Sequence, residues 1–320
     1  MRTYLKDKPW LQLVAFGMLT VLIAFVVSLF GLFVVSLANH ISPMQMSRLS
    51  TEDFSKPENA SIAKGLLIVQ FFGIFFLPSL AFAIIADPRP LAFAGLKKPD
   101  RFSYLFIAIL IIFCSYFMVE WLGALNEQIV QSFLGKKAQD WIEKGENDVG
   151  GTLQNILNMK NAGDLLKSIL LVGGLAAIGE ELFFRGILQR IFIQIFKKPW
   201  VGILVTAALF SAIHGQFLGF IPRMVLGIVL GYLYWYSGSL FTAMLGHFVF
   251  NSFQIVLLYM NLLNSNKQNS VSDKFLPLVG LVAMVIVIGL LFYMRKHSRT
   301  NYTQVYDTPY LGPGKELNAM

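Results

Sequence analysis

The stretch "LLKSILLVGGLAAIGEELFFRGILQR", residues 165–190, joins a long apolar run to two adjacent glutamates. Glu180 and Glu181 follow that run directly, in a chain that otherwise keeps most of its charge outside such runs. An ionisable side chain inside a membrane helix costs about 3 kcal/mol on insertion scales and marks a functional position. The stretch therefore predicts a membrane-spanning helix that carries working carboxylates.

The composition predicts the class of fold around this helix. Of the 320 residues, 56% are hydrophobic and only 14% are charged, which is too apolar for an ordinary soluble domain. About eight apolar runs approach the roughly 20 residues that a helix needs to cross a bilayer, and they are continuous rather than alternating, unlike the strands of a barrel. We expect an all-α polytopic membrane protein with about eight transmembrane helices. The runs centre on 11–37, 65–86, 103–125, 165–184, 200–219, 221–236, 239–263 and 275–294.

The placement of basic residues explains the net charge of +8 without a nucleic-acid partner. Four basic clusters flank the first, second, fourth and eighth runs, so all four fall on one side of the lipid bilayer if eight spans are right. That side is the cytoplasm by the positive-inside rule. We expect a multi-pass cell-membrane protein, in a bacterial inner membrane, with both termini in the cytoplasm. The clusters are Arg2, Lys6 and Lys8; Arg89, Lys97, Lys98 and Arg101; Arg190, Lys197 and Lys198; and Arg295, Lys296 and Arg299.

Polar side chains divide the chain into five predicted parts. Nearly every polar group expected inside the membrane falls in one block of four spans, and the three spans before it form an apolar scaffold. The connection between the two is polar, with apolar positions that indicate one or two short amphipathic helices at the membrane interface. The parts are a scaffold (1–125), an interfacial connection (126–164), a four-helix catalytic core (165–262), a last span (263–294) and a polar cytoplasmic tail (295–320).

Helical spacing shows which polar residues of the block can act together. Residues four apart share a face of a helix. Neighbouring Glu180 and Glu181 differ by about 100° around the helix, so they cannot point at one target in the same way. We expect one glutamate to act in the chemistry of the site and the other to be held by an ion pair with Arg185. The pairs four apart are Glu181 with Arg185, Phe210 with His214, and His247 with Asn251.

The residue types in this block are compatible with several functions. A carboxylate beside an imidazole can activate water, and an imidazole with an amide can stabilise an oxyanion, which together describe an acyl hydrolase. Glu181, His214 and His247 could instead bind a divalent metal such as zinc. The alternatives without a catalytic role are that the histidines only pack between helices, that the Glu–Arg pair is an inert buried ion pair, and that the Asn251 amide only joins two helices. Two other classes stay open, an ion-coupled transporter and a non-catalytic membrane immunity or scaffold protein.

Three motifs in this block resemble those of the CPBP family. "EELFFR" at 180–185 resembles its EExxxR motif, "FSAIH" at 210–214 its FxxxH motif, and "HFVFN" at 247–251 its HxxxN motif. The family groups type II CAAX prenyl endopeptidases with bacterial bacteriocin-processing and Abi membrane proteases. The resemblance implies an intramembrane, glutamate-dependent endopeptidase whose site opens toward the cytoplasm.

The resemblance also implies roles for individual residues. Glu180 would activate water with His214, while His247 and Asn251 would donate hydrogen bonds to the oxyanion. Glu181 and Arg185 complete the first motif and would support the site, and Phe210 would line or pack it. Family members are often called metalloproteases, and these motifs do not decide whether a metal takes part. The implied substrate is a membrane-associated peptide or protein, which in eukaryotic members carries a prenylated CAAX tail.

Overall fold

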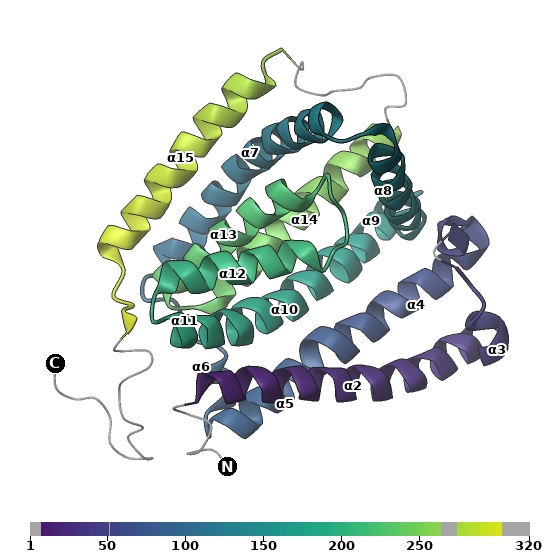
Figure 1. Cartoon of the computed structure of the whole chain (residues 1–320), viewed down its shortest axis with the longest axis horizontal. Helices are drawn as coiled ribbons and strands as arrows, with labels where there is room; N and C mark the ends of the chain where they lie inside the picture. The colour runs from purple at the N-terminus through teal and green to yellow at the C-terminus, as the bar shows by residue number, and fades with distance from the viewer. Residues whose placement is uncertain (1–7, 51, 264–273, 303–320) are drawn as a thin grey trace.

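The computed structural model describes residues 8–50, 52–263 and 274–302, and every regular element within these ranges is helical. The long helices lie side by side in one bundle (Figure 1). Six helices are long and apolar enough to cross a membrane, which confirms the predicted all-α polytopic class. These are Pro9–Ala38, Pro57–Ala86, Ser103–Phe133, Ala162–Phe196, Leu240–Asn261 and Leu276–His297.

The fifth and sixth predicted spans differ from the other six. They form α12 (Pro199–Ala212) and α13 (Phe220–Ser237), two neighbouring helices. The 14 residues of α12 reach about 21 Å at 1.5 Å per residue, which is less than the roughly 30 Å of hydrocarbon. Gly215, with a φ of 66°, lies just beyond the helix end. Left-handed backbone at that position cannot continue an α-helix, so the apolar run ends as a loop that carries His214.

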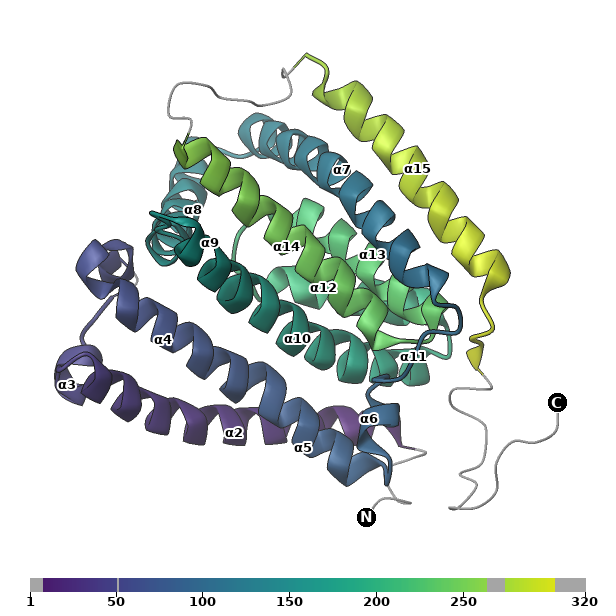
Figure 2. The ribbon, with the colours of Figure 1, turned by 180° about the vertical axis from the view of Figure 1, so that it is seen from behind.

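Two groups of helices flank the central block. On one side, α2 (Pro9–Ala38) packs along a long helix made of α4 (Ala60–Gln70), η3 (Phe71–Phe76) and α5 (Leu77–Ala86). On the other side, α7 (Ser103–Phe133) packs against α13, α14 (Leu240–Leu263) and α15 (Leu276–His297) (Figures 1 and 2). The four-span block therefore lies between two helical walls. Shorter elements are α3 (Pro43–Met46), η1 (Glu52–Ser55), η2 (Pro57–Asn59) and α6 (Pro90–Phe93).

The helix that carries the two glutamates is continuous but not uniform. It runs through α9 (Ala162–Ser168), η4 (Ile169–Gly174), α10 (Leu175–Glu181), η5 (Leu182–Gln189) and α11 (Arg190–Phe196). Both η4 and η5 are π-helical, as is η3 in the neighbouring helix. Such turns are rare, and they occur frequently at functional sites. One of them begins directly after Glu181.

The interfacial connection folds differently from its prediction. The helix α7 continues to Phe133, and a single helix of 21 residues, α8 (Lys136–Ile156), replaces the one or two short helices expected there. Figure 1 shows α8 across one end of the bundle. The predicted tail also starts later than expected, because α15 ends at His297. Residues 303–320 of that tail lie outside the described residues.

The contact between α11 and α12 depends on a glycine. A Cβ added to Gly202 would lie 2.5 Å from Ile193 Cγ1 and 2.7 Å from the Ile193 backbone nitrogen. Backbone cannot move aside as a flexible side chain can. The two helices can approach this closely only because position 202 has no side chain.

We expect Gly202→Ala to lower the stability of the full chain by about 1–3 kcal/mol, the range for overpacking a close contact. The measurement is thermal unfolding of the detergent-solubilised protein. Gly289→Ala is the matched control, because a Cβ there meets no described atom within 4 Å. A Gly202→Ala protein as stable as the Gly289→Ala protein would show that the helices can separate without cost.

Candidate active site

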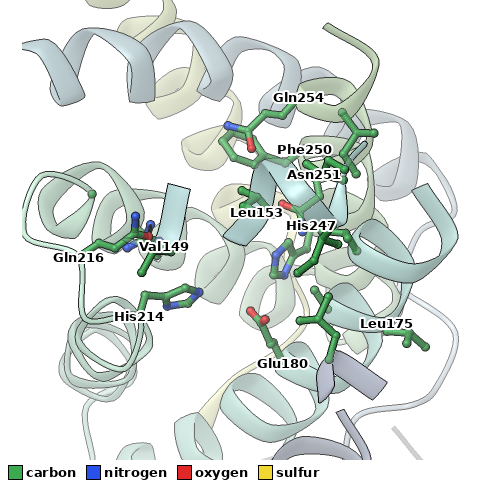
Figure 3. A pocket seen from close by; sticks show the side chains of 18 of the residues that line it. Val149, Leu153, Leu175, Glu180, His214, Gln216, His247, Phe250, Asn251 and Gln254 are labelled. Carbon is green, nitrogen blue, oxygen red and sulfur yellow. Dashed lines mark hydrogen bonds between the residues drawn. The ribbon is translucent and has the colours of Figure 1, made fainter. Parts of the chain in front are cut away.

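A cavity of about 780 Å³ lies inside the bundle. Glu180 from α10, His214 from the loop after α12, and His247 and Asn251 from α14 all line it. Figure 3 shows the side chains of Glu180, His214 and His247 turned toward a common space. The fold thus brings together residues from three separate stretches of sequence.

Glu181 lies outside this cavity lining, in a buried ionic cluster. Its Oε1 accepts a hydrogen bond from Arg185 Nη1 at 2.7 Å, and His247 Nδ1 lies 2.9 Å from the same oxygen. The side chains of Glu181 and Arg185 are 0% and 1% exposed. Arg185 Nη2 also donates to the carbonyl of Gly227 in α13 at 3.1 Å. The two adjacent glutamates therefore differ in environment, one facing a cavity and the other fixed by a cation.

The hydrogen bonds of the two histidines determine which ring nitrogen is available in the cavity. A carbonyl oxygen only accepts, so His214 Nδ1, which lies 2.7 Å from Phe210 O, carries the proton. Neutral His214 then keeps a lone pair on Nε2. Glu181, paired with Arg185, is an acceptor-only carboxylate, so His247 Nδ1 donates to it. Nε2 is therefore the His247 ring nitrogen that is available to the cavity.

Phe210 packs between the ionic cluster and the two imidazoles. The Arg185 guanidinium lies 4.5 Å from the centre of the Phe210 ring. The His214 and His247 rings meet the same phenyl ring edge-on, at centroid distances of 5.1 Å and 6.0 Å. Phe210 is 2% exposed. Its ring therefore fixes the spacing of both histidines and shields the guanidinium.

The predicted metal ligands do not converge. In the part of the chain that the structure describes, no group of three or more His, Cys, Asp or Glu side chains could hold a metal ion. Glu181 is turned toward Arg185 and His247, and it does not line the cavity with His214. Glu181, His214 and His247 therefore do not fit a metal site, and the chemistry below is derived from side chains alone.

The loop that carries His214 is held by residues that the sequence analysis missed. Glu146 of α8 accepts hydrogen bonds from Gln216 Nε2 at 2.8 Å and from the Leu218 backbone nitrogen at 3.0 Å. Asn126 of α7 donates to the Phe217 and Leu218 carbonyls, each at 2.9 Å. These bonds fix the loop from two sides.

Arg223, beside the loop that carries His214, is another residue that the sequence analysis did not identify. It lines the cavity, and its Nη2 donates to Gln216 Oε1 at 2.8 Å. Its Nη1 is buried without a hydrogen-bond partner among the described residues. The signal was present in the sequence, because Arg223 is a charged residue inside a predicted span (221–236), and such residues mark functional positions.

The helix α8 covers the cavity. Thr152, Leu153 and Ile156 from its inner face line the cavity. Its last turn is fixed to the segment after α3, where Asn155 Nδ2 donates to Phe54 O at 2.9 Å and to Lys56 O at 2.6 Å. We call α8 the roof of the cavity.

A short ion pair stabilises the turn on which the roof rests. Lys56 Nζ lies 2.6 Å from Asp53 Oδ1, and Ser50 donates to Asp53 Oδ2 through both its backbone nitrogen and its hydroxyl. The hydrogen bond from Lys56 and then those from Ser50 hold the pKa of Asp53 well below its usual range. Asp53 therefore remains ionised under ordinary conditions and keeps the turn closed.

Comparison with known proteins matches the segment that holds the three motifs. Residues 162–253 match the family model described as type II CAAX prenyl endopeptidase Rce1-like. The family that this model describes consists of CAAX-type intramembrane proteases. The match, which contains all three motifs, supports membership of the CPBP family and confirms the resemblance found in the sequence.

A curated relative matches about a third of the chain. "Uncharacterized protein YpbD" from Bacillus subtilis (strain 168) is 27% identical over 116 residues, which are 35% of this chain and 54% of the relative. The chain thus spans about half the length of that protein. No solved structure matches the chain.

We expect Glu181→Gln and Glu180→Gln to have opposite effects on stability. Glu181→Gln leaves the buried Arg185 charge uncompensated, and breaking a buried pair costs on the order of 3–5 kcal/mol. Glu180 is half-buried at the cavity and makes no hydrogen bond or ion pair with a described residue, so its neutralisation removes a charge from a largely apolar environment without breaking an interaction. Thermal unfolding of the two full-length variants measures the difference. Equal losses from both changes would contradict this assignment.

Proposed function

We propose that the chain is an intramembrane endopeptidase that hydrolyses a peptide bond of a membrane-associated peptide or protein, for which a prenylated CAAX-type tail is one candidate. The observation that carries the proposal is the convergence of Glu180 with His214 and His247 on one cavity inside a bundle of membrane helices. An unpaired carboxylate beside an imidazole lone pair is suited to binding and deprotonating water. The family match at residues 162–253 supports the reaction class.

In the proposed mechanism, Glu180 and His214 bind one water molecule between them. As the water oxygen attacks the carbonyl carbon, its proton moves to the Glu180 carboxylate, and a tetrahedral intermediate forms. When the intermediate collapses, the C–N bond breaks and the proton passes to the leaving amine. The fixed tautomer of His214 supports this role, because its Nε2 is an acceptor throughout.

His247 and Asn251 are the proposed oxyanion donors. They lie one turn apart on α14 and both line the cavity. The Glu181 carboxylate accepts from His247 Nδ1, and Arg185 keeps that carboxylate in place. A ring that carries both protons donates from Nε2 to the oxyanion. Donors that are held in position before charge develops cost little reorganisation during the reaction. Glu181, Arg185 and Phe210 are therefore positioning residues.

We also propose a division of the chain into five parts and a location for its termini. The chain would have a scaffold (1–125), an interfacial connection (126–164), a catalytic core (165–262), a last span that continues to the end of α15 at His297 and a tail after it, in a cell membrane with cytoplasmic termini. The start of α2 and the end of α15 lie at the same end of the bundle, which supports termini on one side (Figure 1).

We expect Glu180→Gln and His214→Ala to lower kcat by roughly 10²–10⁴-fold, the usual contribution of a general acid–base group. The assay is cleavage of a membrane-associated peptide library by the purified full chain. Glu120→Gln is the matched control, because Glu120 is an intramembrane glutamate of α7 that does not line the cavity. Turnover by Glu180→Gln equal to that of the unaltered protein would remove this mechanism.

We expect Asn251→Leu to lower kcat by roughly 10²–10³-fold with little change in KM, because an oxyanion donor acts mainly in the transition state. The kcat and KM values of the same cleavage reaction test this. Asn261→Leu, on the same helix but outside the cavity lining, is the control. An increase in KM at unchanged kcat would show instead that Asn251 only binds substrate.

A further inference from the structure

The cavity occupies only one half of the bundle. From α14 it is lined by His247 and residues further along, and from α13 only by the first turns, up to Leu226. Among the described residues, none from α2, α5, α6, α11 or α15 lines it. The cavity therefore extends from the middle of the bundle toward the end that α8 covers. Figure 1 shows α8 at that end.

Hydrogen bonds define the two ends of the bundle. At the end away from the cavity, the Asp100 nitrogen donates to Ser237 O at 3.0 Å and the Leu240 nitrogen to Gly95 O at 2.8 Å. At the cavity end, α8 is bonded to the loop 213–219 and to η1. Figures 1 and 2 show α6, α11 and the end of α15 at the first of these ends, and α3 and α8 at the second.

The two ends differ in charge. The end away from the cavity is strongly basic, with two acidic residues in its described loops, Asp87 and Asp100. The cavity end carries nine described lysines and arginines, Lys274 included, against eleven at the first end, and they are interspersed with nine acidic residues. The basic residues of the first end are Lys8, Arg89, Lys97, Lys98, Arg101, Arg190, Lys197, Lys198, Arg295, Lys296 and Arg299. Those of the second end include Arg48, Lys56, Lys64, Lys136, Lys137, Lys144, Lys160 and Lys167, among Glu52, Asp53, Glu58, Glu127, Asp140, Glu143, Glu146, Asp148 and Asp164.

We infer that the cavity opens at the non-cytoplasmic face of the membrane and receives its substrate from that face. An excess of lysine and arginine in short loops retains those loops in the cytoplasm, so the basic end is cytoplasmic. The cavity, its roof and the loop bearing His214 then lie toward the opposite face. If the proposed function holds, the substrate class is an exported or outward-facing peptide segment, and this orientation excludes the prenylated CAAX-type tail, which lies in the cytoplasm.

This orientation differs from the cytoplasmic opening that the family resemblance implies. The matched segment, residues 162–253, holds the motifs and part of the basic end. The remaining orienting charges, including Arg89, Lys97, Arg295 and Lys296, lie outside that segment. A catalytic block of one kind can therefore face either side, according to the charges of the helices around it.

Cysteine labelling tests the orientation without requiring turnover. In a Cys114→Ala background, which removes the single native thiol, the full chain carries Lys144→Cys on the roof, Leu153→Cys in the cavity lining or Lys98→Cys at the basic end. Lys144 and Lys98 are both exposed lysines, so these two variants form a matched pair. Spheroplasts of a bacterial host are treated with a membrane-impermeant maleimide before and after permeabilisation.

We expect Lys144→Cys and Leu153→Cys to be labelled in intact spheroplasts, and Lys98→Cys to be labelled only after permeabilisation. The reverse pattern, or labelling of both exposed positions in intact spheroplasts, would overturn the inference. Labelling at Lys144→Cys without labelling at Leu153→Cys would also overturn it, because the cavity would then be closed to that face. Failure of the proposed function would appear separately, as unchanged peptide cleavage by Glu180→Gln.

Discussion

The site depends on one buried guanidinium. Arg185 pairs with Glu181 on its own helix, donates to the Gly227 carbonyl of α13 and packs against the Phe210 ring of α12. Through Glu181 it also reaches His247 of α14. Each of these charges would cost several kcal/mol if left unpaired in a low-dielectric interior. The four helices of the block must therefore keep their relative positions for the cluster to remain satisfied.

This cluster gives adjacent residues different properties. Glu181 is satisfied twice at one oxygen, whereas Glu180 contacts neither cation nor donor among the described side chains and faces the cavity. A group without internal partners contributes little to folding but can bind water or substrate. The chain thus places a carboxylate fixed by an ion pair beside one that faces the cavity, and the rigidity of Glu181 positions Glu180.

The sequence was sufficient to predict interactions within one helix, but it did not predict contacts between residues far apart in the chain. Apolar runs predicted the helices, and the spacing of four residues predicted the Glu181–Arg185 pair, because such rules act within one helix. The contact between Glu181 and His247 joins residues 66 positions apart, and Glu146 reaches Gln216 across 70. No local pattern encodes such distances. The short α12 was missed because its apolar run looks long, although Gly215 ends the helix.

The hydrogen bonds that hold the roof, α8, to the rest of the molecule would allow a helix of different sequence to take its place. Three of the four hydrogen bonds described above join Glu146 and Asn155 to backbone atoms of residues 218, 54 and 56, which are the same whatever residue occupies a position. The fourth joins Glu146 to the Gln216 side chain. The roof also lies outside the segment that defines the family. Related chains could therefore replace α8, and with it the lining that α8 gives to the cavity, while the segment that matches the family model stays unchanged.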